Sequence, residues 1–200
     1  MKVGLILECG RGGPGQQVCV HLIRRIAPQV ELTCVTLSNK PRLIAECGVV
    51  ATALLQNGCE RVVIVWDLFP AWRQPGETHC RGHDRIEIFQ TLANAGLRSP
   101  PVYLVCIAEE LEAWLLSDER ALSAILSTSA HPIRVPRIQR PETMRNPKVR
   151  LLKLFQQNRR GRYNDMFHAI RIVEAMPDLN RIGRCPSFAR FVEKVTARPL

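Results

Sequence analysis

RVVIVWD, at residues 61–67, holds five apolar residues in a row and ends on an acid. Short β-branched runs without polar alternation are typical of strands that are buried on both faces of a parallel sheet. Two other segments have the same form: KVGLIL (2–7), followed by Glu8, and VYLVCIA (102–108), followed by an acidic pair. Each run leads into a stretch with helical signals. The sequence therefore predicts an α/β protein with a mostly parallel sheet flanked by helices.

Four strand–helix units account for the first 127 residues. Strands are expected at 3–7, 30–37, 61–66 and 102–107. Helices are expected at 15–27, 40–57, 83–95, 108–117 and 118–127. We therefore predict an α/β domain over residues 1–127 that is built on a four-stranded sheet.

The remaining residues, 128–200, differ in composition and charge. An irregular link is expected at 128–146, and helices follow at 147–158, 165–176 and 186–197. Residues 1–126 carry 12 Lys and Arg and 13 Asp and Glu. Residues 127–200 carry 16 Lys and Arg but only 5 Asp and Glu, so this C-terminal part supplies the whole net charge of +10. We predict a basic linker and helical extension packed on the α/β domain, with a polyanionic partner. A solvated basic face or an acidic protein partner is the alternative.

Acidic residues stand where the buried strands end. They are Glu8, Asp67, Glu109, Glu110 and Glu112. The carboxyl ends of parallel strands meet at one edge of a sheet, where carboxylates repel one another unless a cation lies between them. Oxygen donors favour Mg²⁺ or Mn²⁺, which suit phosphodiester chemistry. We predict a metal site made by Glu8, Asp67, Glu109 and Glu112, with Glu109 and Glu112 on one face of the expected helix 108–117. Stabilisation of the helix dipole is the alternative role of the last two acids.

The turn after the first strand, GRGGPG at residues 10–15, lets a phosphate or a metal approach the backbone beside Glu8. The same turn matches the dinucleotide-binding pattern GxGxxG. The second strand, however, ends in Leu37-Ser38-Asn39 and offers no acid to bind a ribose, which disfavours a dinucleotide site.

A strand ending in Glu before a glycine-rich turn, and a later strand ending in Asp, resemble the Toprim domain of topoisomerases, primases and old-family nucleases. IAEELEAWLLSD, at residues 107–118, is similar to the E-x-E-A-W-L-x-x-D signature of a Toprim-like family, domain of unknown function 4276. The resemblance extends over nearly the whole chain through Asn146-Pro147-Lys148, Tyr163, His168 and Ser187-Phe188. It implies a Toprim-like, Rossmann-like fold in which Glu8, Asp67 and Glu112 are the catalytic and metal-binding acids.

Two departures from the Toprim pattern affect the expected site. Phe69 stands where the second Asp of an Asp-x-Asp pair is expected, and Gln16 and Gln17 stand where a second acid often appears. Such a site binds one metal instead of two, or is degenerate. The acids that could compensate are Glu110, Glu112 and Asp84.

Basic and aromatic residues of the extension are predicted to bind nucleic acid. They are Lys148, Arg159, Arg160, Arg162 and Tyr163. The cationic groups would hold the backbone and the tyrosine ring would stack on a base, with a solvated loop as the alternative. His168 is either a general acid–base or structural, and His79 and His83 are either supporting groups near the strand ends or surface residues.

These features predict a Mg²⁺- or Mn²⁺-dependent endonuclease that acts on DNA or RNA. The resemblance also implies an ATPase protein partner in a bacterial anti-phage defence system. The alternative is a non-catalytic subunit that binds nucleic acid or an ATPase and keeps a degenerate metal site. No apolar run has the length of a membrane span and the eight cysteines are expected to be reduced, so we predict a cytoplasmic protein.

Overall fold

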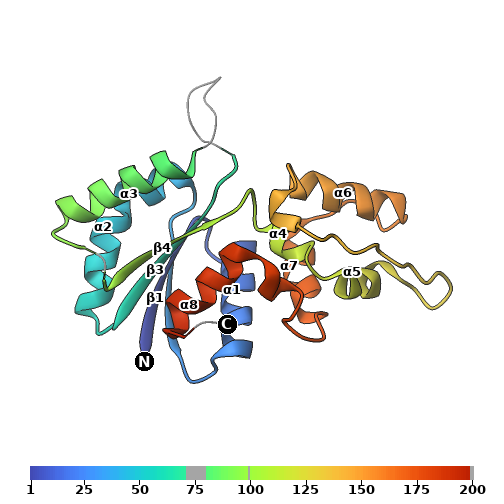
Figure 1. The fold of residues 1–200 in the computed structure, drawn as a ribbon, viewed down its shortest axis with the longest axis horizontal. Coiled ribbons are helices and arrows are strands. Elements are labelled where there is room, and N and C mark those ends of the chain that lie inside the picture. Colours follow the sequence, from blue (N-terminus) through green and yellow to red (C-terminus); the bar gives the residue numbers. More distant parts are fainter. Residues whose placement is uncertain (71–79, 99, 199–200) are drawn as a thin grey trace.

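Four parallel strands form the centre of the molecule (Figure 1). The computed structural model describes residues 1–70, 80–98 and 100–198. The strands are β1 (Lys2–Leu7), β2 (Glu31–Thr36), β3 (Arg61–Asp67) and β4 (Val102–Ile107), in the order β2-β1-β3-β4. The predicted α/β class and flanked parallel sheet are confirmed, and the arrangement is consistent with a Rossmann-like or Toprim-like fold.

Helices cover both faces of the sheet, and β1, β3 and β4 are apolar on both sides, whereas β2 at the edge is only partly buried. Leu5 and Val63 belong to one hydrophobic cluster, which includes α1 (Pro14–Ile26) and α8 (Pro186–Thr196). Ile6 and Ile64 belong to a second cluster, which includes α2 (Lys40–Gln56) and α3 (Arg81–Asn94). This arrangement explains why β1, β3 and β4 are nearly continuous apolar runs without polar alternation.

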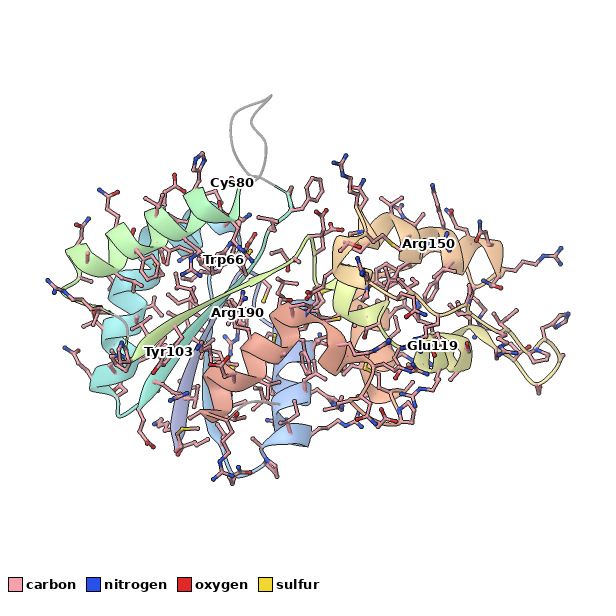
Figure 2. The ribbon with its side chains drawn as sticks, in the orientation of Figure 1. Trp66, Cys80, Tyr103, Glu119, Arg150 and Arg190 are labelled. Atoms are coloured by element: carbon pink, nitrogen blue, oxygen red, sulfur yellow. The ribbon has the colours of Figure 1, made fainter. Side chains whose placement is uncertain are left out.

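A buried ion pair lies in the α2–α3 layer. The Lys40 Nζ lies 3.3 Å from the Asp84 Oδ2, which also accepts a hydrogen bond from the Trp66 Nε1 at 3.1 Å. The side chain of Trp66, which is labelled in Figure 2, therefore extends from β3 to α3. The Lys40 Nζ also donates to the carbonyl oxygens of Leu68 and Pro70, at 2.9 and 3.2 Å. The pair thus ties α2 and α3 to the chain that leaves β3.

The helix predicted at 108–117 is much shorter in the structure. Only α4 (Glu112–Leu115) is helical, and α5 (Glu119–Leu126) follows after Asp118, whose side chain caps it. Glu109 has a φ of 64°, in the left-handed region, and its carbonyl oxygen accepts a hydrogen bond from the Phe69 N–H at 2.7 Å. A residue in that conformation cannot lie within an α-helix, so Glu109 and Glu112 do not share a helix face.

The C-terminal part forms short helices that share one core with the sheet. They are η1 (Pro141–Thr143), α6 (Pro147–Gln157), α7 (Asp165–Glu174), η2 (Ile182–Arg184) and α8. Buried residues form a continuous cluster from Val3 on β1 to Val195 on α8. The Arg25 Nη1 donates to the carbonyl oxygens of Val173 and Met176, which fixes the end of α7 against α1. In Figure 1, α4 to α7 lie together beside the sheet. Among the described residues no helix has the length and apolarity needed to cross a membrane.

Candidate functional site

A cavity of about 160 Å³ lies beyond the carboxyl ends of β1, β3 and β4. Its acidic and basic lining residues are Glu8, Asp67, Glu110, Glu112, Lys148 and Asp165. Cys9 also lines it, but burial raises the pKa of its thiol to about 11, so that thiol is neutral at physiological pH. The cavity is therefore acidic, with one lysine at its edge.

The parallel register of β1 and β3 brings Glu8 and Asp67 together. Leu7 pairs with Val65, and the Glu8 N–H donates to the Val65 carbonyl oxygen at 3.1 Å. The Asp67 N–H in turn donates to the Glu8 Oε2 at 3.2 Å. Burial raises the pKa of Asp67 well above its usual range, and the negative charges of Glu8 and Glu112 raise it further. Bringing these acids together is thus unfavourable for the ionised protein without a counter-ion.

Glu112 is the most deeply buried acid of the cavity, with 5% of its surface exposed. Burial raises its pKa to about 7, and the positive charge of Lys148 opposes part of that rise. The Tyr163 hydroxyl donates to the Glu112 Oε1 at 3.3 Å, and the Lys148 Nζ lies 4.0 Å from the same oxygen. A carboxyl group with a pKa near neutrality and a fixed orientation can both accept and donate a proton.

Lys148 joins three segments at the mouth of the cavity. Its Nζ pairs with the Asp165 Oδ2 at 2.5 Å, and its backbone N–H donates to the Glu110 Oε2 at 3.1 Å. Lys148 and Asp165 lie in the first turns of α6 and α7, and Glu110 lies just before α4. Because 47% of the lysine side chain stays exposed, its ammonium group can also contact a bound anion.

One family model, Domain of unknown function (DUF4276), matches residues 24–196. The chain belongs to this family. The match includes Asp67, Glu112 and Lys148, whereas Glu8 lies before it. Searches of curated proteins and of solved structures found no match.

The acids of this DUF4276 protein meet largely as the sequence predicted, with one exception. Glu8, Asp67 and Glu112 line one cavity, but the Glu109 side chain does not. The left-handed conformation of Glu109 turns the chain, and Glu110 lines the cavity instead.

Tyr163 and Lys148 lie at the acidic cavity and not in one cluster with the exposed arginines. Only 4% of the Tyr163 surface is exposed, so its ring cannot stack on a base in this structure. Its hydroxyl orients Glu112 instead. Lys148 is part of the acidic cavity and lies at the opposite end of α6 from the exposed Arg159.

The other polar residues singled out in the sequence lie away from the cavity. Asp84 is paired with Lys40 and cannot replace a missing ligand. His83 is exposed on α3, and the His168 Nδ1 accepts the Asn164 N–H at 2.8 Å while its ring packs on Phe155. His168 is therefore structural. His79 lies outside the described residues.

The sequence did not reveal Asp165 as part of the cavity. A signal was present, because Asn164-Asp165 begins a helix: the Asn164 side chain caps α7 and Asp165 occupies its first turn. That signal places a helix start but does not say which helix starts lie side by side. The pairing of Asp165 with Lys148 depends on how α6 packs against α7.

The donor set fits a hydrated divalent ion better than a closed protein cage. Across residues 1–70, 80–98 and 100–198, no three His, Cys, Asp or Glu side chains are grouped as metal ligands. Mg²⁺, however, commonly takes one or two carboxylates and keeps several waters. Glu8 and Asp67 supply such a pair, and Glu112 is close enough to raise the pKa of Asp67.

Metal-free protein is expected to lose stability as the pH rises from about 4.5 to 7. The pKa of Glu112 is about 7 in the folded state against 4.5 unfolded, so folding favours its protonated form and the stabilisation is lost as the carboxyl ionises. The loss amounts to about 3 kcal/mol, since one pKa unit corresponds to about 1.4 kcal/mol. Urea unfolding at several pH values should show a smaller loss in Glu112→Gln than in the wild type, because Asp67, whose pKa is also raised, still ionises in the variant. Equal pH profiles for the two proteins would contradict this account of Glu112.

Proposed function

We propose that this DUF4276 protein is a Mg²⁺- or Mn²⁺-dependent nuclease with a Toprim-like α/β domain, acting on DNA or RNA. The observation that carries the proposal is the convergence of Glu8, Asp67 and Glu112 in one cavity at the carboxyl ends of parallel strands. The raised pKa of Asp67 reflects burial and the charges of the other two acids, and a cation would relieve that repulsion.

Four residues of the cavity have proposed roles. Glu8 and Asp67 hold the cation, which when bound would activate water and offset charge on the phosphate. Glu112, oriented by Tyr163, accepts a proton at its Oε1 or Oε2 and can return it. Lys148 presents its ammonium group to a phosphate oxygen at the mouth of the cavity.

The direct test is an incubation of the purified protein with labelled single-stranded and duplex DNA and RNA, in Mg²⁺ or Mn²⁺. We expect metal-dependent products that are absent in EDTA. The same assay should be run with a candidate ATPase partner, because the family resemblance implies one. The eight cysteines carry no disulfide, which suits the reducing cytoplasm where we propose that the protein acts.

The second candidate is a non-catalytic subunit that binds nucleic acid or an ATPase. Phe69 in place of a second acid favours it, as does the lack of a three-ligand group within the described ranges. Calorimetric titration separates the two candidates, since a nuclease of the proposed kind binds Mn²⁺ at the cavity and a degenerate site does not.

Nucleic-acid binding is expected to depend steeply on salt, because cations of the extension release counter-ions when they contact phosphates. Arg159, Arg160 and Arg162 are exposed and follow the end of α6. Reversing all three charges to Glu should flatten the plot of log affinity against log salt by up to about one unit per lost contact. Binding that keeps its slope in the triple variant would point to a protein partner for this cluster.

A further inference from the structure

A second hollow, of about 500 Å³, runs along α1 and the turn before it, beside α7. Its polar lining residues are Arg11, Gln16, Gln17, His21, Arg24 and Glu174. Arg11 and Arg24 form no ion pair among the described residues, and the buried His21 Nε2 has no hydrogen-bond partner there. We call this hollow the α1 groove. The exposed guanidinium groups of Arg11 and Arg24 can contact an anion there, and their two positive charges outnumber the one carboxylate, Glu174.

The α1 groove and the acidic cavity lie on two sides of the same glycine turn. Cys9, Pro14 and Gly15 line the cavity, whereas Arg11 and Gly12 line the groove. The turn therefore separates the two hollows as a low ridge. A chain molecule that crosses this ridge reaches both.

The ridge is braced from the α1 side. The Gly12 N–H donates to the Gln16 Oε1 at 2.7 Å, and the Gln17 Nε2 donates to the Gly12 carbonyl oxygen at 2.6 Å. The two glutamines that replace an expected second acid thus hold the turn in place. A fixed turn lets a ligand backbone pass without ordering the loop first.

Neither packing nor backbone conformation requires a glycine at position 10. No atom lies within 4 Å of the position that its Cβ would occupy, and its φ is not positive. Packing and backbone conformation would both accept a side chain there. An exposed glycine of this kind leaves room for the close approach of another molecule to the ridge.

We infer that a DNA or RNA strand reaches the acidic cavity across this ridge, with neighbouring phosphates held by Arg11 and Arg24 in the α1 groove. The inference rests on the proposed nuclease function, since it assigns the path of that substrate. Arg24 lies nine residues beyond Gly15, or about 13 Å along the helix axis, so the groove can hold more than one nucleotide. Acids hold the cation at the reacting phosphate, while arginines outside the cavity hold the phosphates beside it.

The test measures binding and not cleavage. Fluorescence anisotropy of a fluorescein-labelled oligonucleotide, DNA and then RNA, is followed in EDTA over a range of salt. The double variant Arg11→Glu/Arg24→Glu should weaken binding about tenfold or more and reduce the salt slope by roughly 2, one unit for each lost phosphate contact. The matched control is Arg42→Glu/Arg85→Glu, which makes the same charge change on α2 and α3, across the sheet. It should stay within about twofold of the wild type.

Gly10→Val provides a second, uncharged test, because it should weaken binding without lowering the melting temperature. The inference is overturned if the Arg11/Arg24 variant binds as the wild type does, if the control loses as much, or if the wild type does not bind the oligonucleotides. These outcomes are separate from the nuclease test. A protein that binds through the groove but does not cut supports the groove and contradicts the nuclease function. A protein that cuts, but whose binding is unchanged by Arg11→Glu/Arg24→Glu, supports the nuclease function and contradicts the groove.

Discussion

Glu8→Gln is expected to lower metal-dependent cleavage by about 100-fold or more while nucleic-acid binding is retained. The substitution keeps the size of the side chain and an oxygen that can accept the Asp67 N–H, so the end of β1 should stay in place. It removes one negative charge from the pair that holds the cation. Calorimetry with Mn²⁺ and single-turnover cleavage would measure the two losses together. Anisotropy in EDTA would measure the retained binding.

Glu109→Gln is the matched control for Glu8→Gln. It makes the same chemical change in an acid that follows a strand end but does not line the cavity. We expect its cleavage rate to stay close to that of the wild type. Equal loss in both variants would restore Glu109 as a ligand, and unchanged cleavage by Glu8→Gln would remove the proposed site. If the wild type cuts nothing with either metal and with an ATPase partner present, the non-catalytic subunit becomes the better account.

The sequence predicted the sheet well because the information there is local. β3 and β4 are short apolar runs that begin and end close to the predicted positions. The placement of Glu8 beside Asp67 also followed, since neighbouring parallel strands end at the same edge. Neither result required knowledge of how the C-terminal helices pack.

The errors lie where conformation depends on distant contacts. Glu109 was expected in a helix, but its carbonyl oxygen bonds to Phe69 and its backbone is left-handed. Tyr163 follows an arginine-rich loop, which favoured an exposed role, yet it packs against Phe155 and bonds to Glu112 on another helix. A single sequence shows that a tyrosine is near arginines in the chain. It does not show which helix the ring faces.

Lys40→Met is expected to destabilise the fold by about 3–5 kcal/mol, the usual effect of removing one partner of a buried ion pair. Both Lys40 and Asp84 have only 1% of their surface exposed. The lysine has three donors, and three acceptors surround it: Asp84 and the carbonyl oxygens of Leu68 and Pro70. Methionine fills a similar volume, so the loss comes from removing the ammonium group that faces Asp84 and the two carbonyl oxygens, and not from a cavity. Equilibrium urea unfolding would measure it.

The exposed pair on the same helix is the control for that loss. Arg42→Met breaks the contact of the Arg42 Nε with the Glu46 Oε1, and solvent-exposed pairs of this kind contribute little to stability. A double variant, Lys40→Met/Asp84→Asn, should recover part of the stability that Lys40→Met loses, because the buried charge is gone and Trp66 keeps an oxygen to bond. Leu68 and Pro70 lie one and three residues after Asp67. Lys40→Met should therefore also weaken Mn²⁺ binding at the cavity, although Lys40 does not line it. If Lys40→Met lowers the free energy of unfolding no more than Arg42→Met does, the buried pair does not hold the chain after β3. The position of Asp67 then depends on the sheet alone.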